Sequence, residues 1–117
     1  MLRTEQSIHQ AIAHYLELRL PSRAFWCHVP NGGARSRIEG GILKSMGVKP
    51  GCPDILIVFE GVAYWLEVKS GKGRLQAAQR ECHEALQRAG SEVEVVRSVE
   101  ETEAALREWK IRLRGRQ

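Results

Sequence analysis

The chain has 117 residues, of which 43% are hydrophobic and 27% charged, and its formal net charge is +4. This length and balance fit one globular domain over residues 1–117 and exclude a disordered chain. No apolar run approaches the roughly 18 residues of a membrane-spanning helix. The modest positive charge suits a DNA or RNA partner, although a basic protein without such a partner is about as common.

The cysteine content points to a reducing compartment. Cys27, Cys52 and Cys82 are an odd number of thiols without a CxxC pair, unlike a disulfide framework or a zinc knuckle. We therefore expect a cytoplasmic protein and assign these thiols no chemistry.

The first predicted element is a helix that begins after Thr4, a common N-capping residue, and ends before Pro21. The residues that share one face of it are Glu5, Ile8, Ile12, Tyr15, Leu16 and Arg19. The middle of this stripe is apolar and should face the core. Glu5 is thus a carboxylate at the start of a core-facing stripe, although the helix dipole alone also favours an acidic first turn.

Residues 25–29 are predicted to form a short strand, followed by a loop from Pro30 to Gly33. Ser36 and Glu39 have the spacing of a capping box, which predicts a second short helix that ends at Gly47. A tight loop rich in proline and glycine follows this helix.

A β-hairpin is predicted next, with one strand over Ile55 to Phe59 and its partner over Val62 to Lys69. The first strand is a continuous apolar run, which is typical of a central strand covered on both faces. Asp54 directly precedes it.

The remaining pattern predicts a helix over Leu75 to Ala89 with Gly90 as C-cap, a strand over Glu92 to Arg97, and a last helix. Ser98 and Glu101 form the capping box of that last helix. Its inward residues are expected to be Ala105, Leu106, Trp109 and Leu113. The order of elements predicts an α/β fold whose four-stranded mixed sheet is flanked by α-helices.

The strongest chemical signal is Asp54, followed after 12 intervening residues by Glu67, Val68 and Lys69. Side chains alternate along a strand, so Glu67 and Lys69 share a face. The hairpin can bring Asp54 beside Glu67, and a divalent cation relieves the repulsion of two close carboxylates. Oxygen ligands, with the Val68 carbonyl as a further candidate, favour Mg²⁺ or Mn²⁺ over zinc.

These residues and a bound divalent cation can supply the groups that phosphodiester hydrolysis requires. A divalent cation polarises the phosphate and activates water, while Lys69 is placed to orient that water or to stabilise developing charge. Taken singly, Asp54 could be a turn residue, and Glu67 and Lys69 a solvated strand edge. Together with Glu5 and Gln79 they favour a site, because several polar residues on core-facing stripes otherwise need separate explanations.

Gln79 lies on a predicted apolar helix face with Leu75, Cys82 and Leu86. A polar amide there indicates a residue that faces the site. A hydrogen bond from this amide to a strand carbonyl is the alternative.

The whole pattern resembles the VRR-NUC branch of the PD-(D/E)xK nucleases over about residues 4 to 99. The residues that carry the resemblance are Glu5, Pro30 to Gly32, Gly47 to Asp54, Glu67 to Lys69, Gly71, Gly73, Arg74, Leu75 and Gln79. It implies a restriction-endonuclease-like core and metal-dependent nuclease activity. It also implies that Asp54 and Glu67 bind the metal, that Glu5 helps directly or through water, and that Gln79 belongs to the site.

The resemblance further implies a homodimer that cuts branched DNA, such as four-way (Holliday) junctions or flaps, in repair, recombination or phage replication. The candidate nucleic-acid contacts are Asn31, Gly32, Arg35, Arg37, Lys72 and Arg74. The amides of the loop after Pro30 can bind a phosphate, but a simple turn fits equally well. We expect no nucleotide cofactor, because Gly71 to Gly73 lacks the remainder of a Walker loop.

Two other functions stay open. The chain could be a nucleic-acid-binding module that keeps the nuclease fold without catalysis. It could also cleave RNA, since no residue pattern distinguishes a reader of the 2′-hydroxyl.

Overall fold

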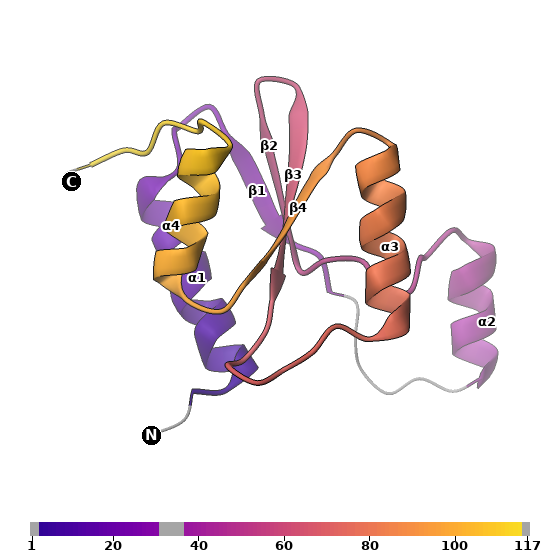
Figure 1. Ribbon diagram of the computed structural model, residues 1–117. Coiled ribbons are helices and arrows are strands. Elements are labelled where there is room, and N and C mark those ends of the chain that lie inside the picture. Colours follow the sequence, from indigo (N-terminus) through magenta and orange to yellow (C-terminus); the bar gives the residue numbers. More distant parts are fainter. Residues whose placement is uncertain (1–2, 31–36, 116–117) are drawn as a thin grey trace.

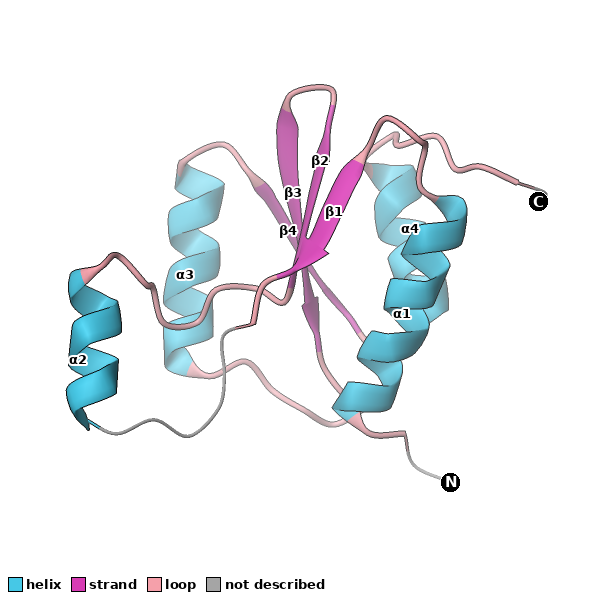
Figure 2. Ribbon diagram, turned by 180° about the vertical axis from the view of Figure 1, so that it is seen from behind, coloured by secondary structure: helices cyan, strands magenta, loops and turns pink. Residues whose placement is uncertain are grey.

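The computed structural model describes residues 3–30 and 37–115, which form a central sheet covered by helices (Figure 1). In chain order the elements are α1 (Glu5–Arg19), β1 (Phe25–His28), α2 (Arg37–Ser45), β2 (Ile55–Phe59), β3 (Val62–Val68), α3 (Ala77–Arg88), β4 (Glu92–Val96) and α4 (Val99–Glu108). Helices α1 and α4 lie on one face of the sheet and α3 on the other, while α2 lies outside these layers on the α3 side (Figure 2).

The sheet has the strand order β1-β2-β3-β4. Strand β2 pairs antiparallel with both β1 and β3, whereas β4 pairs parallel with β3. Helix α3 supplies the crossover that a parallel pair needs. The predicted α/β fold, a four-stranded mixed sheet flanked by helices, is confirmed.

The hydrophobic core fills the layer between the sheet and the helices α1 and α4. Alternate residues of β2, which are Ile55, Ile57 and Phe59, are buried and therefore point to the same side. The helical side chains that complete this layer include Ile8, Ile12, Leu16, Ala105 and Leu106. Burial of each large aliphatic side chain contributes about 1.5–3 kcal/mol, so β2 and the residue before it are firmly placed.

Side-chain caps fix the starts of two helices as predicted. The Thr4 hydroxyl accepts a hydrogen bond from the Ser7 N–H at 2.9 Å, and the Ser98 hydroxyl accepts one from the Glu101 N–H at 3.0 Å. The Glu101 carboxylate reaches back to the N–H of Arg97 at 2.8 Å, one residue before the cap. Such caps satisfy amides that the helix itself leaves unpaired.

Several predicted boundaries were wrong by one or two residues. Helix α3 begins at Ala77, not at Leu75, because Gln76 has extended backbone and its N–H donates to the Gln79 side chain at 2.9 Å. Three of the four predicted strands end one residue earlier in the structure, at His28, Val68 and Val96. The expected cap at Ser36 lies outside the described residues.

The last helix was also predicted to be too long. It ends at Glu108, since Lys110 has a φ of 62°, which a helix cannot contain. Ala105 and Leu106 are buried as expected, while Trp109 and Leu113 pack against the core only in part. Within the described residues, no helix combines the length and hydrophobicity that a membrane crossing requires.

Candidate active site

Asp54 and Glu67 meet at the open end of the β2–β3 hairpin. The register pairs Ile55 with Leu66, so one further step brings Asp54 opposite Glu67. Opposite residues of an antiparallel pair point to the same face. Here that face is the one that α3 covers, away from the main core.

Hydrogen bonds hold both the backbone and the side chain of Asp54. Its carbonyl oxygen accepts from the Val29 N–H at 2.7 Å and from Nδ1 of His28 at 2.9 Å. Its carboxylate Oδ2 accepts from the Val68 N–H at 2.7 Å. Asp54 is therefore fixed between the two neighbouring strands β1 and β3.

The Val68 carbonyl points to the same side of β3 as the Val68 N–H that binds Asp54. In an extended strand the N–H and the C=O of one residue point to the same side. Because the Val68 N–H points at the Asp54 carboxylate, its carbonyl oxygen is presented along the same edge. This edge thus offers a backbone oxygen near the two carboxylates.

Glu67 is an almost fully buried carboxyl group, with 1% of the residue exposed. Burial raises its pKa to about 9, and the hydrogen bond and the charge of Asp54 add to this effect. The charge of Glu5 acts in the same direction, whereas Lys69 lowers the pKa. The site therefore resists a second negative charge unless a cation compensates for it.

Two residues of α3 contact this carboxyl group. The Gln79 amide donates to Glu67 Oε2 at 3.3 Å, as the predicted helix face suggested that it would face the site. His83 Nε2 lies 2.9 Å from Glu67 Oε1. Burial lowers the pKa of His83, so this contact joins a neutral imidazole to the carboxyl group.

Sequence reasoning missed His83. The signal that could have found it is its spacing: it follows Gln79 by four residues and therefore lies on the same helix face. Its partner Glu67 comes from a different element, and only the packing of α3 on β3 brings the two together.

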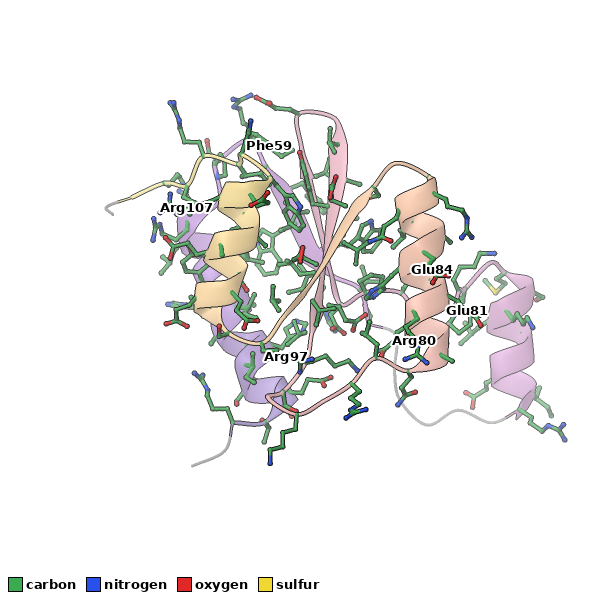
Figure 3. All side chains as sticks on the ribbon, viewed as in Figure 1. Phe59, Arg80, Glu81, Glu84, Arg97 and Arg107 are labelled. Carbon is green, nitrogen blue, oxygen red and sulfur yellow. The ribbon has the colours of Figure 1, made fainter. Side chains whose placement is uncertain are left out.

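Lys69 follows β3 directly and is 7% exposed. Its N–H donates to the Val96 carbonyl at 3.1 Å, which continues the pairing of β3 with β4. The loop after it is fastened by Arg97, whose guanidinium donates to the carbonyls of Ser70 at 2.5 Å and Gly73 at 2.8 Å. Arg97 lies beside this loop in Figure 3, and its contacts keep the loop against the lysine stem.

A cleft of about 610 Å³ opens onto this cluster. The described residues that line it are Glu5, His28, Pro30, Pro50, Gly51, Cys52, Asp54, Gln76, Ala78 and Gln79. Glu5, Asp54 and Gln79 thus share one cleft, and Gln79 connects its wall to Glu67 through the hydrogen bond described above. The predicted nucleic-acid contacts Arg37, Lys72 and Arg74 are exposed but do not line the cleft; Asn31, Gly32 and Arg35 lie outside the described residues.

The loop before Asp54 packs closely on α3. A Cβ atom on Gly51 would lie 2.3 Å from the Ala78 carbonyl oxygen, so only glycine fits there. The Sγ atoms of Cys52 and Cys82 are 4.0 Å apart, and burial together with Cys52 raises the pKa of Cys82 to about 11. The loop and α3 therefore form the rigid wall of the cleft on this side.

The donor set of the site fits a hard divalent cation. Among the described residues, no three side chains of His, Cys, Asp or Glu are grouped closely enough to hold a metal ion by themselves. Mg²⁺ is commonly held by only one or two carboxylates and keeps several waters. Asp54, Glu67 and the Val68 carbonyl would meet that need, and a cation would offset the burial and the neighbouring charge of Asp54, which both raise the pKa of Glu67.

Comparisons with known proteins agree with this geometry. The model of the VRR-NUC domain family matches residues 3–100. A solved structure described as "VRR_NUC domain protein" superposes with a TM-score of 0.69 and 19% sequence identity, covering 93% of this chain and 89% of that chain. At that identity the likeness shows the fold. The sequence matches none of the curated proteins with which it was compared.

Proposed function

Because the chain belongs to the VRR-NUC family of nuclease-type domains, we propose that it is a metal-dependent endonuclease that hydrolyses DNA phosphodiester bonds. The observation that carries this proposal is the pair of carboxyl groups at the open end of the β2–β3 hairpin. Glu67 is buried beside Asp54, and the raised pKa of its carboxyl group, about 9, supports a site in which a cation would let both groups ionise.

The proposed cation is Mg²⁺ or Mn²⁺, which oxygen ligands favour. When bound, it supplies Lewis-acid polarisation of the scissile phosphate and a more acidic water. Asp54, Glu67 and the Val68 carbonyl would hold it directly. Glu5 acts from the cleft wall through water, because it forms no group of three metal-binding side chains with Asp54 and Glu67.

The chain's own residues then have separable roles. Lys69 orients the attacking water and stabilises the negative charge that develops on the phosphate, since a fixed ammonium acts strongly in a site shielded from solvent. Gln79 holds one oxygen of Glu67 by its hydrogen bond. Arg97 keeps the loop after Lys69 in place through two backbone carbonyls.

The proposed substrate is branched DNA. The net charge of +4 favours a polyanion, and the exposed Lys72 and Arg74 follow the catalytic lysine in one loop. These side chains and Arg37 would contact backbone phosphates, which position the protein without reading sequence. A twofold-symmetric homodimer would present two sites to two of the four strands of a four-way junction.

A substrate panel tests this proposal. The purified protein is incubated with end-labelled linear duplex, flap, four-way junction and single-stranded DNA and with matching RNA, in Mg²⁺, Mn²⁺ or EDTA. We expect cuts in a branched DNA in either metal and none in EDTA. Binding without cutting in both metals would favour the non-catalytic module, and cutting of RNA alone would assign the other substrate class.

A further inference from the structure

We infer that His83 is a positioning residue that holds buried Glu67 in the orientation in which this carboxylate binds the divalent cation. The inference rests on the proposed function. It starts from one contact, His83 Nε2 to Glu67 Oε1 at 2.9 Å, in which both residues are buried.

The geometry gives Glu67 two supports from one helix. His83 contacts Oε1 at 2.9 Å, and Gln79, one turn earlier on α3, contacts Oε2 at 3.3 Å. Two contacts to the two oxygens fix the plane of a carboxylate, whereas one leaves it free to rotate. The shorter contact belongs to His83, so the imidazole is the stronger support.

The chemistry of the contact fixes the direction of the hydrogen bond once a cation is bound. An ionised carboxylate only accepts, so Nε2 of His83 must carry the proton and donate it. A neutral imidazole with its proton on Nε2 does this without adding charge beside the cation. Partners of this kind orient metal ligands, and their loss typically weakens metal binding by about 10- to 100-fold.

A purely structural histidine would make the same contact in the metal-free protein. The two roles differ in what a substitution changes. A structural role affects the melting temperature alone, whereas a positioning role also weakens the binding of the cation. Metal affinity measured without DNA therefore separates them.

Three variants provide the test. His83→Gln places an amide nitrogen where Nε2 lies and keeps the donor. His83→Asn keeps polarity but is too short to reach Glu67, and His83→Leu removes the donor. The dissociation constant of Mn²⁺ is measured by electron paramagnetic resonance, with melting in EDTA and the Mg²⁺ dependence of cleavage as further readouts.

We expect the Leu and Asn variants to bind Mn²⁺ about 10- to 100-fold more weakly and to need correspondingly more Mg²⁺ for cleavage. The Gln variant should regain most of the affinity. If the Leu variant does not fold, the contrast between Gln and Asn carries the same test.

The inference is wrong if Asn and Leu variants bind Mn²⁺ as the wild type does and differ only in melting temperature. It is also wrong if Gln binds Mn²⁺ as weakly as Asn. A wild-type protein that neither binds Mn²⁺ nor cuts any substrate would instead overturn the proposed function, and the inference with it.

Discussion

Lys69 shows how burial shapes the chemistry of one residue. Only 7% of it is exposed, although lysine is among the residues least often buried. Its charge acts on the pKa of Glu67, so the ammonium group lies within electrostatic range of the carboxyl pair. A buried cation in this place supports the proposed role at the phosphate.

The first prediction concerns this lysine. Lys69→Met keeps the apolar stem and removes the charge, so we expect a loss of cleavage of at least about 100-fold with little change in DNA binding. Single-turnover cleavage and a gel-shift assay measure the two effects. Lys44→Met, an exposed lysine on α2, is the matched control and should cut normally. Normal cutting by Lys69→Met would contradict the mechanism.

The second prediction concerns the pH dependence of stability in EDTA. The pKa of Glu67 is about 9 in the folded protein, above its ordinary value of 4.5, so the folded state holds this proton more tightly. Its contribution is complete below pH 4.5 and is lost as the pH rises towards 9, which means that the free energy of unfolding falls across this window. The charged groups that face it are Asp54, Lys69 and Glu5.

Urea denaturation between about pH 7 and 8.5 isolates this effect. His83 has a lowered pKa and affects stability below its ordinary value of 6.5, while Cys82 has a raised pKa and acts from about 9 upwards. In Glu67→Gln the slope of unfolding free energy against pH should largely disappear, and saturating Mg²⁺ should flatten it in the wild type. An unchanged slope in the variant would assign the effect to another group.

For single residues, the sequence predicted the shared face of Glu67 and Lys69, because alternation along a strand does not depend on the neighbouring elements. It also indicated Gln79, since an amide stands out on an apolar helix face. The contact between His83 and Glu67 escaped prediction because it depends on how far α3 slides along β3. Neither residue carries that information in its own segment.

Among the elements, the loop before β2 is the most constrained by its neighbour. Gly51 has a φ of +81° and lies against the backbone of Ala78, so it combines a left-handed conformation with close packing. Gly61 in the hairpin turn has nearly the same φ, +80°, but a Cβ atom added there would meet no other atom within 4 Å. A substitution at Gly61 therefore measures the cost of the left-handed backbone alone, whereas one at Gly51 also includes the cost of the close contact.

The third prediction uses this pair. Gly61→Ala should lower the free energy of unfolding by about 1 kcal/mol, the cost of a left-handed alanine, and leave cleavage unchanged. Gly51→Ala should cost about 1–3 kcal/mol more, because its methyl group must displace the loop or α3. It should also reduce cleavage, since Asp54 follows three residues later. Thermal melting and cleavage rates measure both, and equal effects would show that the contact is unimportant.

Element boundaries were predictable where local signals agreed. Helix α1 and strand β2 have the predicted bounds because a cap or a turn coincides with the change in hydrophobic pattern. The start of α3 was misjudged, since Leu75 fits the apolar periodicity while Gln76 has extended backbone. Helix α2 forms although none of its residues is buried, and Ile38 within it and Met46 directly after it remain about three-quarters exposed.

For the whole molecule, the order of elements was enough to predict the mixed sheet and its flanking helices. The order β3, α3, β4 favours the parallel pair that β3 and β4 form, whereas β1 and β2 pair antiparallel although α2 lies between them in the chain. The order of the strands was not predictable in the same way. Strand β1 lies at the edge of the sheet, beside β2. No local sequence pattern distinguishes an edge strand from a central one here.

The fourth prediction concerns assembly. Light scattering under cleavage conditions should give a mass near twice the chain mass of 13.2 kDa, because paired cuts in a junction need two sites. Concentration dependence of the mass, measured alongside cleavage, links the two properties. A mass near one chain in solutions that cut junctions efficiently would exclude the proposed dimer.

The hairpin that carries the site also separates it from the opposite end of the molecule. The turn at Glu60 and Gly61 lies beyond the full length of β2, whose five residues span roughly 16 Å, at the end away from Asp54. Extra residues or a fluorescent label inserted there would extend into solvent without entering the cleft. The turn is therefore a suitable attachment point for a reporter on this protein.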